Sequence, residues 1–133
     1  SEEPASPTQS PHPELYAPQG PSFDLQAALS VTGGRRDVLR KAVTIWWNKI
    51  PSWMQSMKAH LESGQKDGLR KVAHTVKGAA SNIGALAVAE YAHRLETYAE
   101  PPSAETTCLF ECLVMEVERL RVALHSDFPE ANT

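Results

Sequence analysis

Apolar side chains recur every three or four positions along most of the chain, which is the spacing that gathers them on one face of an α-helix. The longest pattern of this kind runs from Leu39 to Leu61. Pro51 falls inside it, yet the pattern keeps the same phase on both sides of the proline. We therefore predict a single helix that is kinked at Pro51 and ends at Gly64.

Three further helices follow from the same spacing. One is expected over residues 65–83, one over residues 86–99, and a last one after a proline pair, where Ser103 can cap the first turn. Because short connections join these helices, the sequence predicts an all-α fold, an antiparallel four-helix bundle. The apolar positions of its last helix are Leu109, Leu113, Val117, Leu120 and Leu124.

A short additional helix is expected before the bundle, with Ser22 as its cap and Gly33-Gly34 at its end. The residues before it differ in composition, because residues 1–21 contain six of the ten prolines and little that could be buried. We therefore divide the chain into a flexible proline-rich linker (1–21), a helical domain (22–128) and a tail (129–133).

Composition excludes several classes of partner. The formal net charge of −3 argues against nucleic acid or a membrane surface as a ligand, and no apolar run is long enough to span a membrane. The two cysteines, Cys108 and Cys112, lie one helical turn apart, which suits neither a disulfide nor a zinc site. We expect reduced thiols and a cytoplasmic protein.

The segment from Ala73 to Ala85 contains two glycines, each of which weakens a helix by about 1 kcal/mol relative to alanine. With about 100° of rotation per residue, the apolar side chains of this helix gather opposite His74. These side chains belong to Leu69, Val72, Val76, Ala79, Ala80 and Ile83. His74 is therefore expected to be exposed, and Gly84 to end the helix and permit a tight turn.

Small and basic residues surround His74 on this outer face. Lys77 carries a positive charge one turn away, and Gly78 has no side chain that could block a macromolecule from reaching the imidazole. A neutral histidine is a competent nucleophile, and a nearby cation suits the oxygens of a phosphoryl group. A convex helix face offers no closed pocket for a small molecule. The residues that we expect to contact a partner protein are Arg70, Lys71, Gly78, Ser81 and Ala85.

The stretch HTVKGAASNIGA, which starts at His74, resembles the H-x-x-K-G signature of histidine-containing phosphotransfer (HPt) domains, the four-helix modules of multistep phosphorelays. The resemblance extends in layout over residues 22–125. It implies that His74 accepts a phosphoryl group from an aspartate on one response-regulator receiver domain and passes it to another receiver. It also implies that the proline-rich start links this module to the rest of a bacterial hybrid sensor histidine kinase, as its C-terminal part.

Further expectations depend on this resemblance. The domain is expected to be a monomeric cytoplasmic module without direct membrane contact, whose parent kinase is anchored in the inner membrane. It is expected to bind no cofactor or metal, so the Mg²⁺ for transfer belongs to the receiver. It is not expected to act as a stand-alone kinase, because the sequence contains no glycine-rich phosphate cradle.

Glu96 is a further candidate for the site. If the two helices that meet near Gly84 form an antiparallel hairpin, His74 and Glu96 lie at the same height. The carboxylate could then accept a hydrogen bond from one ring nitrogen and leave the other free to attack. An ordinary exposed glutamate, paired with Arg94, Lys71 or water, explains the same residue equally well.

The remaining histidines and the tryptophans are interpreted without a function. His60, His93 and His125 are expected at the surface or at its boundary. Trp46 and Trp53 fall on the apolar stripe of the long helix and are expected in the core. Trp47 lies off that stripe and is expected to face the short N-terminal helix or a partner.

Two other functions are compatible with the sequence. A helical adaptor would bind partners without chemistry, and His74 would then be incidental. A kinase dimerisation module would take its phosphoryl group directly from ATP, which requires a nucleotide-binding domain. Transfer of label from a phosphorylated receiver, from ATP or from neither distinguishes the three.

Overall fold

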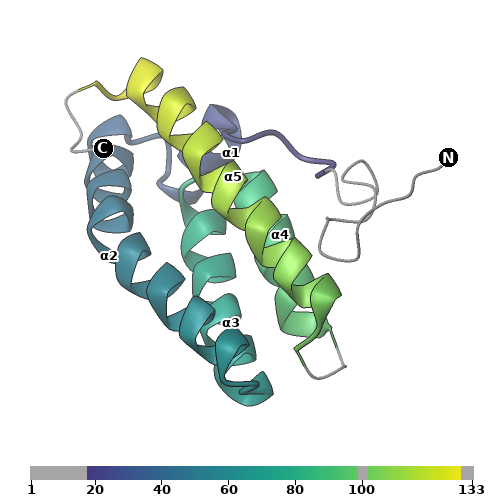
Figure 1. Ribbon diagram of the computed structural model, residues 1–133. Coiled ribbons are helices and arrows are strands. Elements are labelled where there is room, and N and C mark those ends of the chain that lie inside the picture. Colours follow the sequence, from purple (N-terminus) through teal and green to yellow (C-terminus); the bar gives the residue numbers. More distant parts are fainter. Residues whose placement is uncertain (1–17, 99–101, 130–133) are drawn as a thin grey trace, which may run out of the picture.

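The computed structural model describes residues 18–98 and 102–129 of the chain. Helices α2 to α5 run alternately up and down as a bundle, and the short helix α1 lies at one end of it (Figure 1). The predicted all-α bundle with an additional N-terminal helix is confirmed. The helices are α1 (Leu25–Val31), α2 (Arg36–Glu62), α3 (Lys66–Asn82), α4 (Leu86–Thr97) and α5 (Ala104–Asp127).

Helix α2 is one continuous helix with Pro51 in its interior, as the unbroken phase of its apolar positions predicted. Trp46 is buried on the core side, also as expected. Trp47 is buried as well, and the guanidinium of Arg121 in α5 lies 4.4 Å from the centre of its ring. We predicted that Trp47 faces the short N-terminal helix or a partner. The partner alternative was wrong, because Arg121 of α5 packs on the ring and Trp47 is buried.

The predicted start of α1 needs a correction. Its N-cap is Asp24, whose carboxylate accepts a hydrogen bond from the backbone N–H of Ala27 at 3.0 Å. The Ser22 hydroxyl instead donates to the buried carboxylate of Glu116 in α5, at 3.0 Å. A serine hydroxyl serves equally well as a cap or as a donor to a carboxylate, and the packing of α5 decided between the two.

The segment before α1 lies against α4. The backbone N–H of Ala87 donates to the carbonyl oxygen of Pro21 at 2.9 Å, and that of Gln19 donates to the Glu90 carboxylate at 2.8 Å. Residues 18–21, which we assigned to the linker, are thus held by the bundle. The rest of the predicted linker (1–17) and most of the predicted tail (130–133) lie outside the described residues.

The turn between α3 and α4 sets the height at which these two helices face each other. Gly84 has φ of +74°, a conformation that strains any other residue, and its carbonyl oxygen accepts a hydrogen bond from the Asp24 N–H at 2.9 Å. A Cβ atom at position 84 would lie 2.5 Å from the carbonyl oxygen of Asp24 and 2.9 Å from the Cβ of Ala28. The predicted helix end at Gly84 is confirmed, and α1 docks on the same glycine.

Helix α5 completes the core as expected. Ser103 is its N-cap, in a capping box with Thr106. Phe128, directly after the helix, is fully buried and packs edge to face against Phe23, which brings the two ends of the domain together. The five predicted core positions of α5 are all buried: Leu109, Leu113, Val117, Leu120 and Leu124.

Candidate functional site

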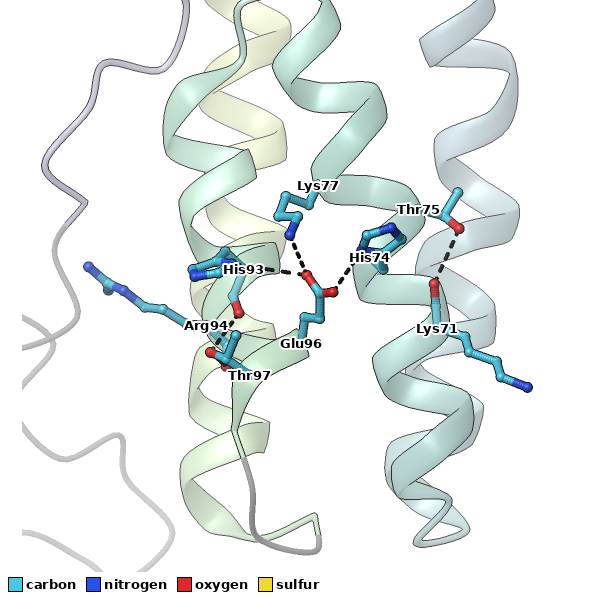
Figure 2. Close-up of polar contacts among 8 residues, drawn as sticks. All are labelled: Lys71, His74, Thr75, Lys77, His93, Arg94, Glu96 and Thr97. Carbon is cyan, nitrogen blue, oxygen red and sulfur yellow. Dashed lines mark hydrogen bonds and ion pairs between the residues drawn. The ribbon is translucent and has the colours of Figure 1, made fainter.

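His74 lies on the outer face of α3, as predicted. The core side of this helix is formed by Leu69, Ala73, Val76 and Ala80, all of them buried. The side chain of His74 is 68% exposed, and its Nδ1 atom lies 2.7 Å from Oε2 of Glu96 in α4 (Figure 2). The predicted contact across the hairpin is therefore present.

Glu96 joins His74 to Lys77. While Oε2 faces the His74 ring, Oε1 lies 2.7 Å from Nζ of Lys77, so one carboxylate bridges two residues of α3 (Figure 2). Neither Arg94 nor Lys71, the two basic residues that we considered as ordinary partners of Glu96, pairs with its carboxylate in this site. Arg94 pairs with Glu90, and Lys71 points away from the carboxylate (Figure 2).

The electrostatics of this bridge keep Glu96 ionised. The hydrogen bond from Lys77 lowers the pKa of Glu96 most, the hydrogen bond from His74 lowers it further, and partial desolvation opposes both. An ionised carboxylate only accepts hydrogen bonds, so the proton of a neutral His74 is assigned to Nδ1 from this network. The lone pair of Nε2 then belongs to an exposed side chain that is free to act as a nucleophile.

Gly78 has no role inside the molecule. It is exposed, and a Cβ atom added there would meet no atom within 4 Å. At Gly68 of the same helix, in contrast, a Cβ atom would lie 2.3 Å from the ring of His60 in α2. The missing side chain at position 78 therefore changes only the outer surface of α3, one turn from His74.

An open hollow of about 650 Å³ adjoins His74 on the side of the α3 N-terminus. Arg70 contributes a positive charge to it, but its guanidinium lies 3.8 Å from the carboxylate of Asp67. Because Lys77 is likewise opposed by Glu96, this face is less positive than its basic residues suggest. The hollow is lined by Asp67, Arg70, Lys71, His74, Thr75 and Glu96.

Ala85 is a correction to the predicted partner surface. It is fully buried and forms the N-cap position of α4, whereas Ser81 is exposed as expected. The prediction extended the rotation of α3 through residue 85, but α3 ends at Asn82. The positive φ of Gly84 then turns the chain, and Ala85 points into the core.

Two neighbours of Glu96 were not predicted. Besides Lys77, His93 lies on the preceding turn of α4, with Nδ1 4.0 Å from Oε1 of Glu96. Both could have been predicted from the same hairpin alignment that placed His74 opposite Glu96. Lys77 lies one turn after His74 and His93 about one turn before Glu96, so an antiparallel pair also aligns Lys77 with His93.

Within residues 18–98 and 102–129, no cluster of three or more histidine, cysteine or acidic side chains is arranged to hold a metal ion. No helix in these ranges is long and apolar enough to cross a membrane. Cys108 and Cys112 are free thiols, and burial raises the pKa of Cys112.

Comparison with known protein families gives one match. The model of the Hpt domain family matches residues 41–123, which is more than half of the chain. The matched range runs from the first turns of α2 into the last turns of α5 and includes His74, Lys77 and Glu96. No curated protein and no solved structure matches the chain.

Proposed function

The chain belongs to the Hpt domain family, whose members carry out histidine phosphotransfer in two-component phosphorelays, and on that premise we propose that His74 is its phosphoryl carrier. In this proposal His74 receives the phosphoryl group from an aspartate of one receiver domain and delivers it to an aspartate of another. The observation that carries the proposal is the contact of His74 Nδ1 with Glu96 at 2.7 Å on an otherwise exposed ring.

The incoming step is a displacement at phosphorus. The Nε2 lone pair forms the new P–N bond while the P–O bond to the donor aspartate breaks, and the aspartate leaves as a carboxylate. The imidazole becomes positively charged as this bond forms, and Glu96 stabilises that charge through the proton on Nδ1. In the outgoing step a second aspartate attacks phosphorus, and the P–N electron pair returns to Nε2.

Lys77 has two tasks in this scheme. In the unphosphorylated chain its ammonium group, at 2.7 Å from Oε1, keeps Glu96 charged and oriented. It also lies one turn after His74 on α3, and its flexible side chain carries the positive charge that the phosphoryl oxygens require.

The receiver is proposed to dock on the exposed face of α3 around His74. Gly78 leaves room for a close approach, Ser81 continues this low surface, and Arg70 and Lys71 border it with positive charge. The fully buried Ala85 does not belong to this docking surface. Micromolar affinity, about 8 kcal/mol, suits a carrier that has to release one receiver before it meets the next.

We further propose that the receiver supplies the Mg²⁺ for transfer. Glu96 is the acidic side chain that contacts His74, and both of its oxygens already face basic groups. Mg²⁺ prefers six oxygen ligands in octahedral geometry, which one occupied carboxylate does not provide. The proline-rich composition of residues 1–17 also supports a linker to other domains, and we propose a monomeric cytoplasmic module of a hybrid sensor kinase.

The test is transfer of label from a phosphorylated receiver in the presence of Mg²⁺, followed by Phos-tag gel analysis. We expect the wild-type chain and a His125→Gln control to take the label, and a His74→Gln variant to take none while its melting temperature stays within a few degrees. ATP alone should label none of them. Failure of the wild-type chain to take label would support an adaptor, and label from ATP alone a self-acting kinase module.

A further inference from the structure

His93 lies next to the bridge between His74 and Lys77, although the proposed mechanism does not use it. Its side chain is 57% exposed, and its Nδ1 atom lies 4.0 Å from Oε1 of Glu96, the same oxygen that Lys77 contacts at 2.7 Å (Figure 2). Two basic side chains, one from each helix, are thus directed at a single carboxylate oxygen. Lys77 occupies it, and His93 lies just beyond hydrogen-bonding distance.

This arrangement matters because the second task of Lys77 can draw its ammonium group away from Glu96. If its ammonium group turns toward the oxygens of a phosphoryl group on His74, Oε1 of Glu96 loses its partner. At the same moment the phosphoryl group brings up to about two negative charges close to the Glu96 carboxylate. A carboxylate oxygen without a partner is unfavourable beside a phosphoryl group, so a second basic group at Oε1 would stabilise the phosphorylated state.

We propose that His93 is a positioning residue that replaces Lys77 at Oε1 of Glu96 when His74 carries the phosphoryl group. A change of the His93 side-chain torsions would shorten the 4.0 Å separation to a hydrogen bond, because the two residues lie one turn apart on α4. Glu96 would stay paired and would continue to hold Nδ1 of His74, while Lys77 is released. This inference rests on the proposed function of His74.

Among the surrounding basic groups, His93 is the one positioned to pair with Oε1 of Glu96 once Lys77 is released. From α3, the groups that face the carboxylate are His74 and Lys77, which are both engaged in the transfer. On α4, the neighbouring Arg94 pairs with Glu90, which lies nearly two turns before Glu96. Imidazole also fits the task, since it donates a hydrogen bond when neutral and adds a positive charge at mildly acid pH.

The proposal predicts a pH-dependent stabilisation of the phosphorylated state. Below about pH 6 a histidine contributes both a charge and a hydrogen bond, and above about pH 8 it contributes the hydrogen bond alone. The benefit of His93 should therefore be largest at acid pH. A lysine at this position should provide its charge at both pH values, and a leucine should provide nothing at either.

The test uses the full chain, phosphorylated with phosphoramidate, which transfers its phosphoryl group to imidazole nitrogen with loss of ammonia. The half-life of phosphorylated His74 is followed by ³¹P NMR at about pH 6 and about pH 8, on either side of the usual imidazole titration. We expect His93→Leu to shorten the half-life about threefold at the lower pH and less than about twofold at the higher one, as for a half-exposed ion pair. His93→Lys should match the wild-type half-life at the lower pH and exceed it at the higher one, and His125→Leu is the matched control on α5.

A second readout reports on His93 itself. The ¹⁵N signals of its ring should change when His74 is phosphorylated in the wild-type chain, and they should not change in a Glu96→Gln variant. Equal half-lives of the wild-type and His93→Leu chains at both pH values, or His93 signals that ignore phosphorylation, would overturn the inference while leaving the proposed function intact. If His74 takes no phosphoryl group from either phosphoramidate or a receiver, the proposed function fails and this inference fails with it.

Discussion

Two glycines of one short segment, Gly78 and Gly84, have opposite surroundings. At Gly84 the backbone has a positive φ, and a Cβ atom would collide with Asp24 and Ala28 of the segment that docks there. At Gly78 the helix is regular, and a Cβ atom would meet nothing within 4 Å. Glycine is required at position 84 by the fold itself, whereas at position 78 the fold would be served better by alanine.

This difference shows how a residue that lowers helix stability can indicate a function. A residue that weakens a helix and is not explained by packing within the molecule needs an explanation outside it. Gly78 lies one turn from His74, whose free ring nitrogen belongs to an exposed side chain. The open surface at Gly78 therefore supports a partner that has to approach this histidine closely.

The largest effect on stability is expected at the turn. Gly84→Ala should lower the free energy of unfolding by about 2–3 kcal/mol, because it adds both backbone strain and a collision with α1. The control is Gly33→Ala, where φ is +65° but no atom lies within 4 Å, so strain alone should cost about 1 kcal/mol. Urea unfolding of both variants measures the difference, and equal losses would show that the contact with α1 adds nothing.

The exposed glycine should behave in the opposite way. Gly78→Gln should slow transfer from a phosphorylated receiver about tenfold, which corresponds to about 1.4 kcal/mol of lost binding, while stability stays unchanged or rises. Gly78→Ala, which adds one methyl group, should stabilise the helix and impair transfer much less. Normal transfer by the glutamine variant would remove the reason that we give for this glycine.

A smaller effect sharpens the description of the docking face. Arg70 is opposed by Asp67, whereas Lys71 has no ion-pair partner among residues 18–98 and 102–129. Association with a receiver should therefore slow by about twofold to threefold in Lys71→Gln, and less in Arg70→Gln. Stopped-flow association rates at low and at physiological salt measure this, and salt should reduce the gap between the two variants. An equal loss in both would show that Asp67 does not offset Arg70.

The smallest effect concerns the stability that the Glu96 bridge contributes. The pKa of Glu96 is lowered in the folded chain, so its contribution is present above the unfolded value of about 4.5 and is lost as the pH falls through the lower folded value. Glu96→Gln should therefore cost at most about 1 kcal/mol at neutral pH, and this cost should disappear in acid. Thermal unfolding from neutral pH to about pH 3 checks the sign, which would be wrong if the cost grew on acidification.

Much of the site followed from two regular features of the sequence. The apolar period of α3 determined which side of the helix His74 occupies, because a helix buries its apolar face whatever partner covers it. The glycine turn between α3 and α4 then determined that Glu96 lies opposite His74, because an antiparallel hairpin fixes the height of both helices. Both inferences depended on local geometry alone.

Other features were decided only when the helices came together. Ala85 became buried because the chain turns at Gly84, beyond the end of α3, where helical rotation no longer applies. Ser22 lost the cap position to Asp24 because Glu116 of α5 offered it another partner. The common reason is that a sequence period describes positions within one helix and not across its end.

The sequence by itself thus determined the helices, the fold class and the exposed histidine, since each depends on side chains a few positions apart. The tertiary structure decided which groups share the Glu96 carboxylate. Lys77 from one helix and His93 from the other contact or approach the same oxygen, Oε1, because α3 and α4 pack closely enough for their side chains to meet. Nζ of Lys77 contacts Oε1 at 2.7 Å, whereas Nδ1 of His93 lies 4.0 Å from the same atom. Such a difference arises only from the packing of two helices against each other.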